Sequence, residues 1–74
     1  MIADRLEKLI EEMVEKGVHF EDAIREFEKR FILLVLVRHD GSLTKTADTL
    51  GMHRNTLTRK MGAYKIRRRA GGAG

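Results

Sequence analysis

Seven consecutive apolar residues, Phe31 to Val37, lie in the middle of a chain of only 74 residues. The run reads FILLVLV, and taken alone it fits either a buried β-strand or a helix that is apolar on every side. A helical stripe of apolar residues enters the run without an intervening turn residue, so we predict a helix. A chain this short buries a modest fraction of its surface and usually needs a staple or a partner subunit.

No covalent or metal staple is visible in the sequence. It contains no cysteine, which excludes disulfides and thiolate metal sites. Its histidines, His19, His39 and His53, stand 20 and 14 residues apart and fit no local spacing of metal ligands. We therefore expect a second subunit to cover one face of the apolar run, while the rest of the chain covers the other.

Apolar side chains recur at three- and four-residue steps along most of the chain, and this period predicts an all-α protein. Ser42 suits a helix N-cap because its hydroxyl can accept a backbone N–H. Gly17 and Gly51 can take the left-handed conformation that closes a helix or allows a sharp turn. We expect four helices, at about residues 2–16, 20–39, 43–50 and 53–65.

These helices divide the chain into three functional parts. We assign residues 1–39 to dimerisation, residues 40–66 to a helix-turn-helix unit, and residues 67–74 to a basic and then glycine-rich flexible tail. The apolar stripe of the first two helices is the expected contact between subunits. Its predicted members are Leu6, Leu9, Ile10, Met13, Phe20, Ile24, Phe27, Phe31, Leu34 and Val35.

Charge is distributed unevenly between the two halves of the chain. Residues 1–37 hold six Lys or Arg against nine Asp or Glu, a formal charge of −3, whereas residues 38–74 hold nine against two, a charge of +7. A basic half joined to an acidic half indicates that the second half alone approaches a polyanion. A solvated basic face without a partner explains the same numbers.

The stretch from Ser42 to Tyr64 has the residues that a DNA reader needs. If Leu57, Met61 and Tyr64 turn inward, a 3.6-residue helix turns Asn55 and Arg59 outward. Arg can bond bidentately to guanine and Asn to adenine, and exposed amides at a helix start suit phosphate. The predicted DNA contacts are Ser42, Thr44, Lys45, His53, Arg54, Asn55, Thr56, Thr58, Arg59, Lys60, Lys65, Arg67, Arg68 and Arg69.

Each of these residues also has a purely structural interpretation. Ser42 is as well explained as a helix cap, and both roles can hold together. His53 fits a weak cap of the last helix as well as a base contact. Asn55 and Thr58 fit solvated helix positions. Contacts from residues 67–69 would not depend on the DNA sequence.

The pattern resembles the Fis family and the Fis-like C-terminal domains of NtrC-type transcriptional activators. The resemblance covers about residues 20–66, where residues 27–33 are similar to the long second helix of that family. It is carried by Gly41-Ser42, Ala47, Leu50-Gly51-Met52, Arg54, Thr56-Leu57, Lys60-Met61 and Tyr64. It implies a homodimer with an intertwined four-helix core, and two recognition helices that enter successive major grooves of bent DNA.

The sequence departs from the family pattern at four positions. Ser42 stands where Asn is common, Thr46 where Ala is common, and His53 where Asn or Ser is common. Thr58 replaces a frequent basic residue. We expect these changes to alter the preferred DNA sequence. We expect the docking mode to remain the one that the resemblance implies.

Other functions remain open or are disfavoured by the sequence. The chain can be a regulator or nucleoid-architecture protein by itself, the DNA-binding end of a larger activator, or a helical adaptor that binds an acidic protein. RNA binding lacks surface aromatics, since Tyr64 is needed inside. No catalytic constellation, cofactor motif or small-molecule pocket is expected. With acidic residues near the N-terminus and no apolar run longer than seven residues, we expect no membrane span and a cytoplasmic location at the nucleoid.

Overall fold

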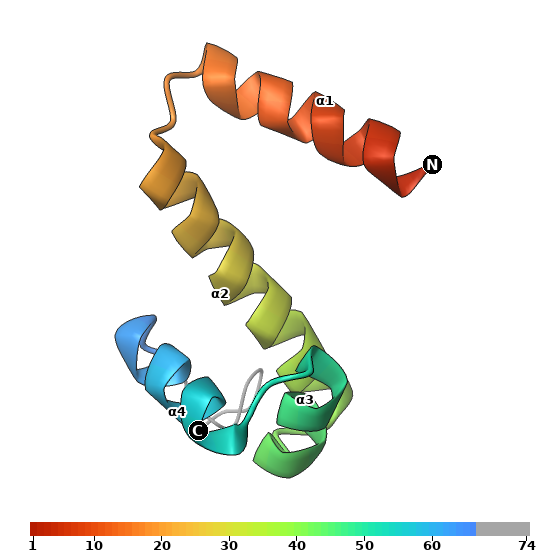
Figure 1. The fold of residues 1–74 in the computed structure, drawn as a ribbon, viewed down its shortest axis with the longest axis vertical. Helices are drawn as coiled ribbons and strands as arrows, with labels where there is room; N and C mark the ends of the chain where they lie inside the picture. Colours follow the sequence, from red (N-terminus) through yellow and green to blue (C-terminus); the bar gives the residue numbers. More distant parts are fainter. Residues whose placement is uncertain (67–74) are drawn as a thin grey trace.

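The computed structural model describes residues 1–66, and in this part of the chain it holds four α-helices and no strand (Figure 1). The predicted all-α class is confirmed, and the predicted ranges differ from the observed ones by at most two residues at any end. The predicted tail, residues 67–74, lies outside the described residues. The helices are α1 (Ile2–Glu15), α2 (Phe20–Arg38), α3 (Leu43–Leu50) and α4 (Arg54–Ala63).

Helix α1 projects from the N-terminal end of α2 and lies away from α3 and α4 (Figure 1). Among the described residues, it contributes no buried side chain. Gly17, at φ +78°, closes it as predicted, and the Val18 amide donates back to the Met13 carbonyl at 2.9 Å. The closure is a left-handed C-terminal cap that leaves the apolar stripe of α1 in solvent.

The core lies where the C-terminal half of α2 meets α3 and α4. Within the described residues it consists of Ile32, Leu36, Ala47, Leu57 and Met61, each at most 6% exposed. The apolar run in α2 is helical, as predicted, and the rest of this one chain covers one of its faces. The other face stays open, since Phe31, Leu34 and Val37 remain 50%, 54% and 46% exposed.

Two tight joints fix α3 and α4 against α2. Asp40 and Gly41 both have positive φ, 53° and 83°, and the Gly41 amide donates to the Leu36 carbonyl at 2.9 Å. Ser42 caps α3 as predicted, because its Oγ accepts from the Lys45 amide at 3.3 Å. Gly51, at φ +71°, ends α3 in the left-handed conformation that a residue with a Cβ rarely adopts. The chain therefore reverses within a few residues between α3 and α4.

Thr46 lies in this core although its hydroxyl has no hydrogen-bond partner among the described residues. A buried hydroxyl without a partner costs about 1–3 kcal/mol. A Thr46→Val variant keeps the branched shape and removes the hydroxyl, so we expect its free energy of unfolding to rise by about 1 kcal/mol. Urea denaturation at one fixed protein concentration measures the change.

The matched control is Thr44→Val, because Thr44 lies on the same helix and is exposed. Its effect should stay within about 0.5 kcal/mol, as for other surface substitutions. A Thr46→Val protein that unfolds more easily than the parent would show that the hydroxyl stabilises the core.

Candidate nucleic-acid interface

The candidate interface is the outer side of α4 together with the start of α3. Leu57 and Met61 hold α4 against the core, at 0% and 6% exposed. Helical geometry then turns the opposite side of α4 to solvent. The exposed residues of that side and of the helix start include Arg54, Asn55, Thr58 and Arg59, all predicted DNA contacts.

The start of α4 is capped by a histidine. His53 has the extended backbone of an N-cap, at φ −71° and ψ 145°, and its Nδ1 accepts from the Asn55 amide at 3.3 Å. The separation is at the long end for a hydrogen bond, which agrees with the predicted weak cap. In this arrangement a neutral His53 carries its proton on Nε2 and keeps one ring donor for another acceptor.

The two helix starts offer different groups to a polyanion. At α3, Ser42 is half-buried and uses its hydroxyl in the cap, while Thr44 and Lys45 are exposed. At α4, the Asn55 amide donates to His53, whereas the other amides of the first turn lie beyond the reach of intrahelical carbonyls and suit phosphate oxygens. The structure therefore brings together short polar side chains, basic side chains and free backbone donors within one helix-turn-helix.

The other end of α4 is tied to α2 through a carboxylate. Glu28 Oε1 accepts from Lys60 Nζ at 2.9 Å and from the Tyr64 hydroxyl at 2.6 Å. All three residues are half-buried. Glu28 was not among the site residues predicted from the sequence, and it lies 32 and 36 positions from its partners.

This cluster shifts the pKa of each of its members. The Tyr64 hydroxyl, followed by the Lys60 ammonium, lowers the pKa of Glu28 below its ordinary 4.5. Hydrogen bonding to the carboxylate raises the pKa of Lys60 above 10.5 and the pKa of Tyr64 above 10.0. Each shift favours the state in which Glu28 is ionised, Lys60 is charged and Tyr64 is a neutral donor.

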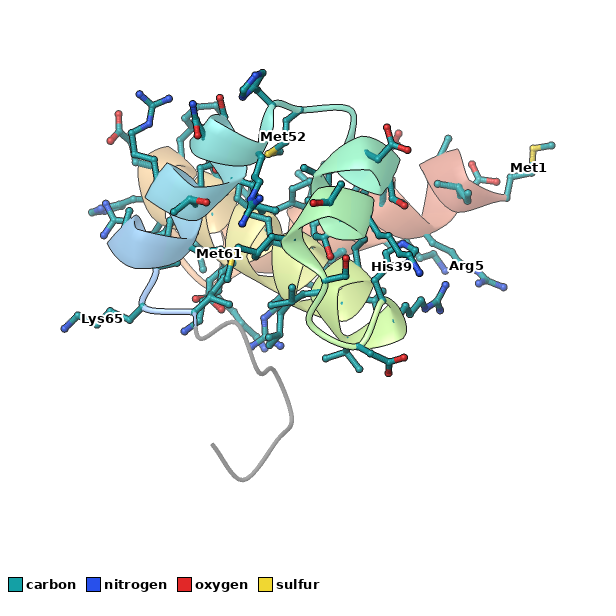
Figure 2. All side chains as sticks on the ribbon, turned by 90° about the horizontal axis from the view of Figure 1, so that it is seen from below. Met1, Arg5, His39, Met52, Met61 and Lys65 are labelled. Atoms are coloured by element: carbon teal, nitrogen blue, oxygen red, sulfur yellow. The ribbon has the colours of Figure 1, made fainter. Side chains whose placement is uncertain are left out.

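The remaining predicted contacts fall into three groups. Thr56 is half-buried on α4, so it is less open than its neighbours Asn55 and Thr58. Lys65 follows α4 with a left-handed backbone, φ 58°, and its side chain extends away from the helices (Figure 2). Arg67, Arg68 and Arg69 lie outside the described residues.

The predicted subunit contacts are mostly open to solvent in the single chain. Met13 and Val35 are half-buried. The others are 41–78% exposed, namely Leu6, Leu9, Ile10, Phe20, Ile24, Phe27, Phe31 and Leu34. The rings of Phe27 and Phe31 lie 5.4 Å apart, so part of this apolar surface is already organised as a cluster.

Metal-binding clusters and membrane-spanning helices are both absent from the part of the chain that the structure describes. Residues 1–66 contain no group of three or more His, Asp or Glu side chains placed to hold a metal ion. No helix in that range has the length and apolar character to cross a bilayer.

Comparison with known proteins places the helix-turn-helix in a family. A family model described as "Bacterial regulatory protein, Fis family" matches residues 23–64. The chain is 35% identical over 52 residues to the "Hydrogenase transcriptional regulatory protein HoxA" of Bradyrhizobium diazoefficiens. That match covers 70% of this chain and 11% of HoxA, so the chain corresponds to a small part of a much longer relative. No solved structure matches the chain significantly.

Proposed function

Since the chain belongs to the Fis family of bacterial regulatory proteins, we propose that it acts as a homodimeric transcription regulator that reads DNA with two copies of α4. The family is one of helix-turn-helix DNA-binding regulators, which makes double-stranded DNA the partner.

The exposed side of α4 is the observation that carries the proposal. In α4, which follows the turn at Gly51, the side chains of Arg54, Asn55 and Arg59 face solvent. Leu57 anchors the same helix in the core. A helix held in this way presents its N-terminal residues to the major groove, where Arg selects guanine and Asn selects adenine. Thr44 and Lys45 of α3 then lie on the side that contacts the phosphate backbone.

Dimerisation is supported by the open apolar surface of α1 and α2. Phe27, Phe31 and Leu34 are each half or more exposed in the single chain, a degree of exposure typical of an interface rather than of a monomer surface. A twofold axis through this surface would relate the α4 helices of the two subunits. Docking in successive major grooves then requires them to lie about 34–36 Å apart, and bending of the duplex adds contacts.

The match to HoxA favours one of two settings for this domain. The chain resembles a small part of a protein named as a transcriptional regulator, which supports a DNA-binding end of an NtrC-type activator. The alternative is a free-standing regulator or nucleoid-architecture protein of the Fis type. Either setting places the domain on DNA in the bacterial cytoplasm.

Equilibrium binding to duplex DNA tests the proposed function. The protein is titrated against a labelled duplex of about two helical turns at several salt concentrations, while sedimentation equilibrium gives its mass alone and in the complex. We expect a dimer bound to one duplex, with an affinity that falls steeply and linearly in log–log form with salt. A folded monomer that ignores the duplex at low salt would overturn the proposal.

Truncation of Arg54 should weaken and broaden recognition. Arg54→Ala removes a side chain suited to bidentate contact with guanine, so we expect a loss of about 1–3 kcal/mol and relaxed preference at one base position. Competition against duplexes substituted at single positions measures both effects.

The control is Arg30→Ala, which removes the same charge from α2. Arg30 is paired with Glu26 at 3.1 Å on an exposed face of that helix and is not among the predicted DNA contacts. If both variants lose the same affinity and neither changes the sequence preference, the assigned role of Arg54 is wrong.

A further inference from the structure

We infer that Glu28 is a positioning residue for the recognition helix, and that it holds Lys60 as an internal counter-ion outside the set of phosphate contacts. The inference rests on the proposed function and concerns the inner flank of α4 rather than its exposed side. It reverses the role that the sequence suggested for Lys60, which was grouped there with the basic residues that approach DNA.

The geometry of the cluster gives Glu28 its positioning role. One oxygen, Oε1, accepts from Lys60 Nζ and from the hydroxyl of Tyr64, the residue that follows the last turn of α4. The hydrophobic effect that buries Leu57 and Met61 is non-directional. Two hydrogen bonds to an ionised acceptor are directional, so they fix the rotation of α4 about its own axis relative to α2.

Rotation of α4 matters because it sets where its base-reading side chains point. A base contact in the major groove tolerates little displacement, and a site holds its geometry only when neighbouring groups lock it. Glu28 lies on α2, the same helix that carries the exposed apolar surface used for the proposed dimer. The link therefore joins the orientation of the reading helix directly to the helix that sets the distance between subunits.

The position of Lys60 explains why it is not a phosphate contact. At 100° per residue, Lys60 lies on the flank of α4 that faces α2, whereas Asn55 and Arg59 lie on the outer side. Its side chain is 35% exposed and its ammonium touches the Glu28 carboxylate. An ammonium already neutralised by a carboxylate adds little to the counter-ions released when the protein binds DNA.

The dependence of binding on salt separates the two roles for Lys60. A plot of log affinity against log salt has a negative slope, and each lost phosphate contact reduces its magnitude by about 0.9. A substitution that removes one contact in both subunits therefore reduces the magnitude by about 1.8. The comparison uses Lys60→Met, Lys45→Met from the exposed start of α3, and Tyr64→Phe, which removes the second bond to Glu28 without changing charge. Circular dichroism fixes a temperature at which every variant is folded.

We expect Lys60→Met and Tyr64→Phe to keep the parental slope and to bind about two- to five-fold more weakly, as the loss of a partly exposed charged contact implies. Lys45→Met should reduce the magnitude of the salt slope. Lys60→Arg keeps a cation within reach of Glu28 and should restore affinity. A role limited to folding stability would leave the affinity of every folded variant unchanged, so the measured weakening tests positioning itself.

A fall in slope of about 1.8 for Lys60→Met would overturn the inference while leaving the proposed function intact. Unchanged affinity for Tyr64→Phe would overturn the positioning role of Glu28. If Lys60→Met does not fold, Lys60→Gln, which keeps a polar group of similar reach, replaces it under the same criteria. A parent protein without salt-dependent duplex binding would instead refute the proposed function.

Discussion

A Leu34→Lys variant is expected to be a monomer and to lose about a hundredfold or more in affinity for duplex DNA. Leu34 is 54% exposed in the single chain, so a lysine there leaves the core of its own subunit undisturbed. Lysine also favours a helix. In the proposed dimer, however, two ammonium groups would be buried without partners, which costs more than the interface recovers.

The loss of affinity follows from the loss of bivalent binding. A second recognition helix tethered to the first typically strengthens binding by about 10²–10⁴. The added lysine raises the positive charge of each subunit, and charge alone would raise duplex affinity. Weaker binding by this variant therefore reports the broken dimer and not a change in electrostatics.

Sedimentation velocity gives the mass of the variant, and fluorescence anisotropy gives its duplex affinity. Leu34→Met is the matched control, since it keeps an apolar side chain of similar volume and should remain dimeric. Dimeric Leu34→Lys with parental affinity would show that the exposed surface of α2 does not join the subunits.

A Leu57→Ala variant is expected to lose about 2–5 kcal/mol in its free energy of unfolding. Leu57 is 0% exposed and packs in the cluster that joins α2, α3 and α4. The substitution removes buried methyl groups and leaves a cavity that the short helices fill only in part. The free energy of unfolding of a native protein is about 5–15 kcal/mol, so this loss is a large share of the total stability.

Denaturant unfolding at a fixed concentration measures the effect, because the stability of a dimer depends on concentration. Thr58→Ala, one position further along α4 and exposed, is the control for stability and should change it by about 0.5 kcal/mol or less. A Leu57→Ala protein as stable as the parent would contradict the assigned core.

Local patterns in the sequence were enough to find the helices and the turn. Gly51, Ser42 and Leu57 were assigned from the properties of one residue type at one spacing, and those properties act over only a few residues. The left-handed turn at Gly17 that closes α1 was recognised for the same reason. Each of these features depends on backbone geometry that the neighbouring sequence controls.

Features that depend on distant parts of the chain were not recoverable in this way. The contact of Glu28 with Lys60 spans 32 positions, and nothing near either residue indicates the other. The i, i+4 spacing of Lys60 and Tyr64 was the one available signal, since it places both on the same side of the C-terminal end of α4. Asp40 and Lys65 have positive φ although neither is glycine. The residue types in these two turns gave no sign of that backbone conformation.

Helix α1 contributes no buried side chain within the described residues, so under the proposed dimerisation its folding would depend on protein concentration. An isolated helix of 14 residues is marginal in water, whatever its sequence. Under the proposed pairing, α1 becomes ordered at the moment two copies meet, so ordering and assembly are one cooperative equilibrium. The occupancy of a promoter would then rise more steeply than the number of molecules in the cell. The cellular concentration of the protein would therefore regulate its own binding to DNA.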